Sequence, residues 1–158
     1  MKRILKIYTQ ILKILLTFMM ILLIVPVFLQ IVSRFVDFIP RYIWTEEIAR
    51  FAFIWIIMLG ATIAVREGTH FSVDMLGNYS PRTENILRQI LLIAMLVFSI
   101  FFLFGGWIFA QTGLMQHSEI AGLPMIAIYM AWPLAGLSWL FFVCEQLYDH
   151  FADQEKTH

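Results

Sequence analysis

Charged positions divide this chain into four long apolar runs. No charged residue occurs within residues 14–33, 51–65, 90–110 or 120–144. A helix that crosses the roughly 30 Å hydrocarbon core of a bilayer needs about 20 mostly apolar residues. The pattern therefore predicts an all-α integral membrane protein with one domain of four transmembrane helices, spanning about residues 12–33, 46–66, 88–110 and 120–145.

The second run is too short to cross the bilayer by itself. Residues 51–65 would form a helix of roughly 22 Å, at about 1.5 Å per residue. Charged residues border this run on both sides: Glu46, Glu47 and Arg50 before it, and Arg66 and Glu67 after it. We therefore expect the front end of the second helix to lie at the membrane boundary or partly inside it.

Charged and small residues share one face of this second helix. A rotation of about 100° per residue places Arg50, Gly60 and Ala64 within about 40° of Glu46. We call this side the Arg50 face; its residues are Glu46, Arg50, Ile57, Gly60, Ala61 and Ala64. Small residues let a neighbouring helix approach closely, and charged residues in a membrane face protein or water. We predict a contact with a partner protein here, with these candidate residues: Glu46, Glu47, Arg50, Gly60, Ala61, Ala64, Arg66 and His70.

An ordinary helix start is the other account of the charged front end. Thr45 suits an N-cap, and Glu46 and Glu47 suit the positive end of the helix dipole. Glu46 and Arg50 also form a favourable pair at a spacing of four residues. Capping does not require the charges to align with the small residues, but both accounts stay open.

Composition supports the membrane assignment and excludes several classes. Hydrophobic residues make up 61% of the 158 residues and charged residues only 14%, against about 25% charged in a soluble domain. The formal net charge is zero, so no basic surplus indicates nucleic acid as a partner. Cys144 is the only cysteine, which excludes an internal disulfide and a cysteine-rich metal site.

The two ends of the chain differ in charge. The basic residues Lys2, Arg3, Lys6 and Lys13 precede the first run, which is too long for a signal-peptide core and lacks a small-residue cleavage site. We expect an uncleaved first span, interrupted by Pro26. Acidic residues dominate the other end, and we expect a frayed polar tail there: Glu145, Asp149, Asp153 and Glu155.

The connectors indicate how the helices lie in the membrane. Residues 34–45 mix charge with aromatic side chains, which predicts a segment along the bilayer surface. Eight Lys and Arg residues fall in the N-terminus, the loop between spans two and three, and the C-terminus, against three in the connector after span one and none after span three. The excess places both termini in the cytoplasm.

No pattern of a catalytic or redox site accompanies the four helices. A haem-binding anchor needs histidines within the bundle, but the four histidines fall in predicted loops or the tail: His70, His117, His150 and His158. Every acidic residue lies at or beyond a predicted helix end, whereas a proton-coupled carrier needs one within a span. We expect neither an enzyme nor a cofactor. His70 either is a pH-sensitive contact or simply ends a helix beside Arg66, and we favour the second interpretation.

The central stretch resembles a known family. Its pattern W-x-E-E-x-A-R begins at Trp44, a run containing Gly60 and Ala61 follows, and R-E-G-x-H-x-x-V-D occupies residues 66–74. This pattern, with the length and the number of spans, resembles the small membrane subunit of tripartite ATP-independent periplasmic (TRAP) transporters. Outside the stretch the resemblance is one of layout alone, because the other spans are generic apolar helices.

The resemblance implies a role within a larger assembly in the bacterial inner membrane. It implies a large multi-span permease subunit that carries substrate and sodium, and a periplasmic substrate-binding protein for which this chain forms part of the docking surface. It further implies an organic acid such as sialic acid or a C4-dicarboxylate as the substrate, with membrane lipid as the surroundings. The alternative is a free-standing four-helix membrane protein that self-associates through the same face.

Overall fold

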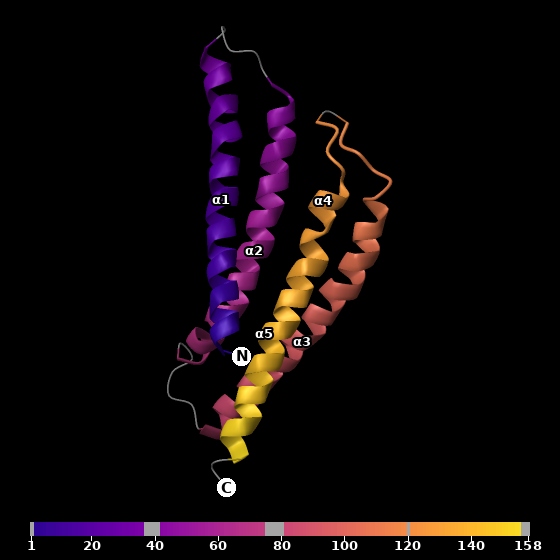
Figure 1. The fold of residues 1–158 in the computed structure, drawn as a ribbon. Coiled ribbons are helices and arrows are strands. Elements are labelled where there is room, and N and C mark those ends of the chain that lie inside the picture. Colours follow the sequence, from indigo (N-terminus) through magenta and orange to yellow (C-terminus); the bar gives the residue numbers. More distant parts are fainter. Residues whose placement is uncertain (1, 37–41, 75–80, 120, 156–158) are drawn as a thin grey trace.

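The computed structural model describes residues 2–36, 42–74, 81–119 and 121–155. The helices in this part of the chain are α1 (Lys2–Phe35), α2 (Trp44–Asp74), α3 (Pro81–Thr112), α4 (Ile126–Tyr129) and α5 (Ala131–Glu155). Figure 1 shows them as two pairs, α1 beside α2 and α3 beside α5. The described residues form no β-strand, so the all-α prediction is confirmed.

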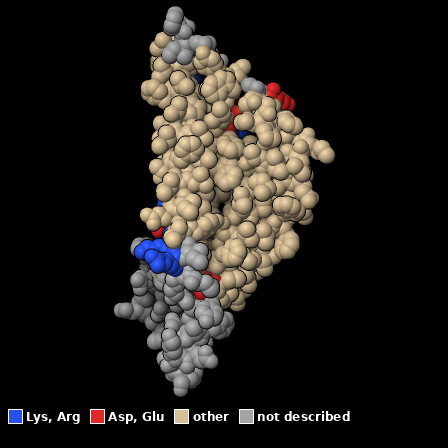
Figure 2. All heavy atoms as spheres, in the orientation of Figure 1, with Lys and Arg blue, Asp and Glu red and all other residues tan. Residues whose placement is uncertain are grey.

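Four helical segments are long and apolar enough to cross a membrane. They are Leu5–Phe35, Trp44–Glu67, Gln89–Thr112 and Ile126–Leu147. Many large apolar side chains on α1 and α3 point outward, Phe28 and Phe101 among them. Figure 2 shows a face almost without charged atoms between its two ends. This surface suits a bilayer, where contact with lipid costs an apolar side chain nothing.

Close backbone approach joins α3 to α5. A Cβ atom on Gly136 would lie 2.5 Å from the backbone nitrogen of Leu103, and one on Gly106 would lie 2.8 Å from the nitrogen of Pro133. Only glycine fits at such contacts, because any side chain would force the helices apart. Ala131 and Ala135 of α5 are also buried.

The centre of the bundle brings α1, α2 and α5 together. Leu12, Leu59, Ile63 and Phe142 form a buried apolar cluster. The hydroxyl groups of Tyr8 and Ser138 share a hydrogen bond of 2.7 Å between α1 and α5. Polar side chains that find partners in this way are stable within a membrane-embedded interior.

The fourth apolar run is not helical from its start. Residues 113–119 and 121–125, here called the return segment, fold back on themselves: Ser118 N–H donates to Leu123 O at 2.8 Å, and Met125 N–H donates to Gln116 O at 3.0 Å. Gly122 has φ +63°, a conformation that glycine adopts without strain, and Pro124 cannot donate a backbone hydrogen bond. These two residues delay the helix until Ile126, although a span from about residue 120 was expected.

The structure tests the expected polar tail at the C-terminal end but describes the expected surface connector, residues 34–45, only in part. The expected polar tail from Glu145 onward is wrong, because α5 continues to Glu155 and Glu145 is buried within it. Apolar residues continue beyond Glu145 at helical spacing, so the helix still has a side to bury. In the expected surface connector, residues 37–41 lie outside the described part of the chain.

Candidate partner-binding site

The Arg50 face is not covered by the rest of the described chain. Glu46, Arg50 and Ala64 are exposed, and Ile57 is 47% exposed. A Cβ atom on Gly60 would meet nothing within 4 Å, while Ala61 is half-buried. The side of α2 that packs against α1 and α5 is the opposite one, with these buried residues: Thr45, Ala52, Leu59, Thr62 and Ile63. The Arg50 face is therefore available to another molecule.

Glu47 is engaged inside the chain. Its Oε2 atom accepts a hydrogen bond from the Ser118 hydroxyl and another, 2.7 Å long, from the backbone N–H of Ala121. One carboxylate thus holds the return segment against the first turn of α2, through charge-assisted bonds that are stronger than neutral ones. Whether Glu47 also meets a partner stays a prediction.

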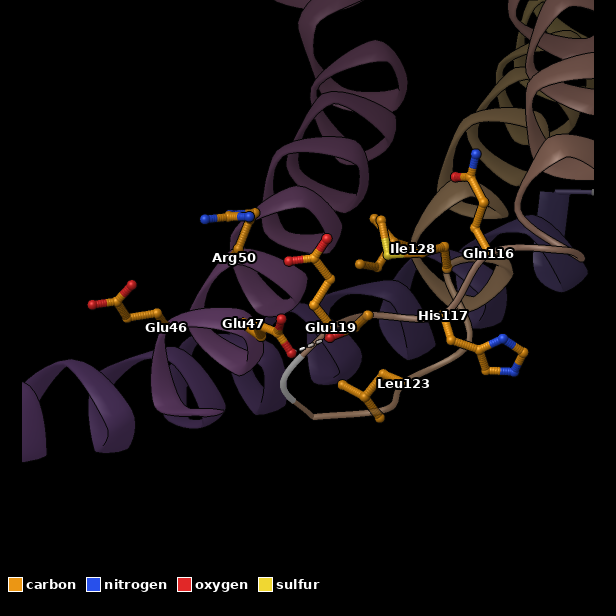
Figure 3. A pocket seen from close by; sticks show the side chains of 10 residues that line it. Glu46, Glu47, Arg50, Gln116, His117, Glu119, Leu123 and Ile128 are labelled. Atoms are coloured by element: carbon orange, nitrogen blue, oxygen red, sulfur yellow. Dashed lines mark hydrogen bonds between the residues drawn. The ribbon is translucent and has the colours of Figure 1, made fainter. Parts of the chain in front are cut away.

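A charged hollow lies where the return segment faces the start of α2 (Figure 3). Its volume is about 400 Å³, and its lining includes Glu46, Glu47 and Arg50 from α2 with His117 and Glu119 from the return segment. In Figure 3 the side chains of Glu46 and Arg50 extend to the same side, away from His117. The hollow therefore adjoins the charged end of the Arg50 face, and its lining carries both acidic and basic side chains.

Arg66 is also used within the chain, at the other end of α2. Its guanidinium forms an ion pair with Glu145 of α5, and it lies 5.3 Å from the centre of the Phe142 ring. The Glu145 side chain is 5% exposed and that of Arg66 is 23% exposed. The second carboxylate oxygen of Glu145 has no hydrogen-bond partner among the described residues. This pair joins the two helix pairs through a buried charge.

Thr45 does not cap α2, so the N-cap prediction is wrong. The helix begins one residue earlier, at Trp44, and Thr45 is only 1% exposed. Its hydroxyl donates to Tyr42 O at 2.6 Å and accepts from Gln30 Nε2 at 3.2 Å. The threonine therefore fastens α2 to α1, and burial takes precedence over the local capping preference. The side chain of His70 lies outside the part that the structure describes.

Several connecting residues were missed in the sequence. The Trp55 indole donates to Ala127 O at 3.0 Å, and the Trp139 indole donates to Thr62 Oγ1 at 3.1 Å. These bonds join segments 72 and 77 residues apart, so no local pattern predicts them. Glu145 could have been found from the sequence, because it follows the fourth apolar run as Arg66 follows the second, and apolar residues come after it. Among the described residues, no three His, Cys, Asp or Glu side chains are placed to hold a metal.

Known proteins match this chain over its central part and beyond. The family described as tripartite ATP-independent periplasmic transporters, DctQ component, matches residues 23–153. A small permease protein assigned to a TRAP transporter of Haemophilus influenzae is 39% identical over 94 residues, which cover 59% of this chain and 58% of that protein.

Two further relatives carry a substrate in their names. The sialic acid TRAP transporter permease protein SiaT of Haemophilus influenzae is 33% identical over 99 residues, which cover 56% of this chain and 16% of SiaT. The C4-dicarboxylate TRAP transporter small permease protein DctQ of Vibrio cholerae is 33% identical over 66 residues, or 41% of this chain and 28% of that protein. The chain thus spans less than two thirds of each of these three relatives.

The family match extends over most of the chain and includes residues 23–35 of the first membrane-crossing segment and the whole of the other three. Members of this family are transporter components, which confirms that the chain is not an enzyme. The chain therefore belongs to the DctQ, or small permease, family of TRAP transporters and is a multi-pass protein of the bacterial inner membrane.

Proposed function

We propose that this chain is the small permease subunit that scaffolds a large permease subunit, in a sodium-coupled TRAP transporter supplied by a periplasmic binding protein. One observation carries the proposal: the Arg50 face combines charge, small residues and exposure, and no described part of the chain covers it. A membrane helix keeps an exposed arginine and a string of small residues on one side where protein covers them.

The relatives support a large partner. The matched region amounts to only 16% of SiaT, which is named as a permease protein. A segment similar to this chain therefore occurs there within a much longer permease chain. In the present protein we assign the corresponding contact to a separate large subunit, reached through the Arg50 face.

The substrate class follows from the relatives' names. SiaT is named for sialic acid and the Vibrio cholerae relative for C4-dicarboxylates. Both are organic acids, so we propose an organic acid as the transported solute. We place substrate and sodium binding in the large subunit.

We further propose that both termini are cytoplasmic, because Lys and Arg favour that side eight to three. The charged hollow then opens toward the periplasm, where a binding protein would dock. A reporter enzyme fused after His158 should be active in the cytoplasm. Activity restricted to the periplasm would contradict this topology.

Co-purification tests the proposed assembly. The tagged chain, expressed together with a large TRAP permease from the same genome, should retain that permease in equal amount. Arg50→Glu should release it, whereas Arg3→Glu, which changes an exposed arginine at the far end of α1, should not. A stable homo-oligomer that ignores the permease would favour the self-associating alternative instead.

A further inference from the structure

Two further hollows adjoin each other along the α1–α2 pair. The return segment lines neither of them. The apolar hollow, of about 220 Å³, is lined by Phe18, Ile21, Leu22, Val25, Pro26, Leu29, Trp44 and Ile48. The polar hollow, of about 410 Å³, is lined by Leu29, Gln30, Ser33, Arg34, Tyr42, Thr45 and Glu46. Leu29 belongs to both.

The two adjoining hollows are together called the groove. Besides Leu29, they are joined by two aromatic side chains, Tyr42 in the polar hollow and Trp44 in the apolar one, whose ring centres lie 5.9 Å apart. Tyrosine and tryptophan favour the level of the lipid headgroups. The groove therefore passes from the hydrocarbon region to the headgroup region at the end of α1.

The polar hollow presents one cation and one anion. Arg34 and Glu46 are both exposed, and neither forms an ion pair with another described residue. Much of the remaining polar lining is already bonded: Gln30 donates to Thr45 at 3.2 Å, and Ser33 donates to Gln30 O at 3.0 Å. The first bond holds the α1 and α2 walls together, and the second lies within α1. The two charged side chains take part in neither bond.

We propose that this groove binds a phospholipid with a primary-amine headgroup, such as phosphatidylethanolamine. The acyl chain lies in the apolar hollow, the phosphate accepts hydrogen bonds from the Arg34 guanidinium, and the ammonium donates to the Glu46 carboxylate. Arginine suits a phosphate because its planar fork offers several donors at once. The site shares Glu46 with the Arg50 face, whereas Arg34 and the apolar hollow lie outside that face.

The paired charges favour this lipid over others. Phosphatidylglycerol has a phosphate but no cation for Glu46, and its negative charge would be repelled by that carboxylate. Phosphatidylcholine has a cation without an N–H group, so it cannot donate a hydrogen bond to Glu46. Only a primary-amine headgroup offers Glu46 a cation that also donates hydrogen bonds.

Tryptophan quenching tests the site in the purified chain. Lipids brominated on the acyl chain quench a nearby indole, and Trp44 lines the apolar hollow. The quenching that disappears in Trp44→Phe reports on this groove alone. In detergent, brominated phosphatidylethanolamine should give this signal at a concentration about tenfold lower than the phosphatidylcholine or phosphatidylglycerol analogue.

Variants separate the headgroup contacts from the chain contact. Arg34→Ala should weaken binding of all three lipids about tenfold, and Glu46→Gln should remove the preference for the amine headgroup. Arg3→Ala, at the opposite end of α1, is the matched control and should change neither. Val25→Trp should fill the apolar hollow and abolish the Trp44-dependent signal. This second variant keeps the proposal testable if the Arg34 variant does not fold. Equal quenching by the three lipids, or binding unchanged by Arg34→Ala, would overturn the proposal.

Discussion

The two ends of α2 carry similar charges but use them differently. At the Arg66 end, the described charged side chains form ion pairs within the chain: Arg66 pairs with Glu145, and Glu67 pairs with Lys13. At the Glu46 end, only Glu47 is held by the return segment, while Glu46 and Arg50 are exposed. A charge that has a partner within the chain holds the subunit together, and a charge left open is available to another molecule.

Removing the buried anion should have the largest effect on the isolated subunit. Glu145→Ala leaves Arg66 without its partner in a site that is mostly buried, and we expect a loss of about 3 to 5 kcal/mol in the free energy of unfolding. Unfolding in a denaturing detergent measures this loss. Lys13→Ala is the control, because its pair with Glu67 is half exposed, and it should cost about 1 kcal/mol or less. Equal costs for the two variants would remove the distinction between a buried and an open pair.

Reversing the open charge should break the assembly while sparing the subunit. Arg50→Glu puts a third acid beside Glu46 and Glu47, and in a contact shielded from water we expect a loss of about 3 to 5 kcal/mol in assembly. Uptake of the solute should be abolished at matched expression, and the unfolding of the isolated chain should change little. Normal uptake by this variant would return the charged front end to a role as an ordinary helix start.

Loosening the return segment should have an intermediate effect. Glu47→Gln weakens the charge-assisted bonds to Ser118 and Ala121, and we expect a cost of about 1.5 to 3 kcal/mol if both bonds weaken. Hydrogen exchange of the Ala121 amide should rise in the variant while exchange in α3 stays unchanged. Unchanged protection at Ala121 would show that other contacts hold the segment.

Filling the small-residue position should have the smallest effect, and only in the complex. Gly60→Leu meets open space in the isolated chain but should overpack against a neighbouring helix, at a cost of about 1 to 3 kcal/mol in assembly. Gly136→Ala is the opposite control, because its Cβ atom would lie 2.5 Å from Leu103 and should destabilise the chain by itself. A complex as stable with Gly60→Leu as without it would exclude a tight helix contact there.

The amino-acid sequence by itself determined the membrane class, the four spans and the exposed side of α2. Long uncharged runs allow few structures other than helices in lipid, because every backbone polar group must be satisfied locally. The Arg50 face could also be predicted, since positions 46, 50, 57 and 64 share a side of any regular helix.

Only the tertiary structure decided which charged side chains have a partner within the chain and which are exposed. The bonds from Glu47 to Ala121 and from Arg66 to Glu145 join residues 74 and 79 positions apart, and helical periodicity carries no information across such distances. The same holds for Thr45, whose local preference predicts a cap but whose burial against Gln30 makes it a link between helices. Periodicity gives the direction of a side chain on its own helix, whereas the partner depends on how the helices pack.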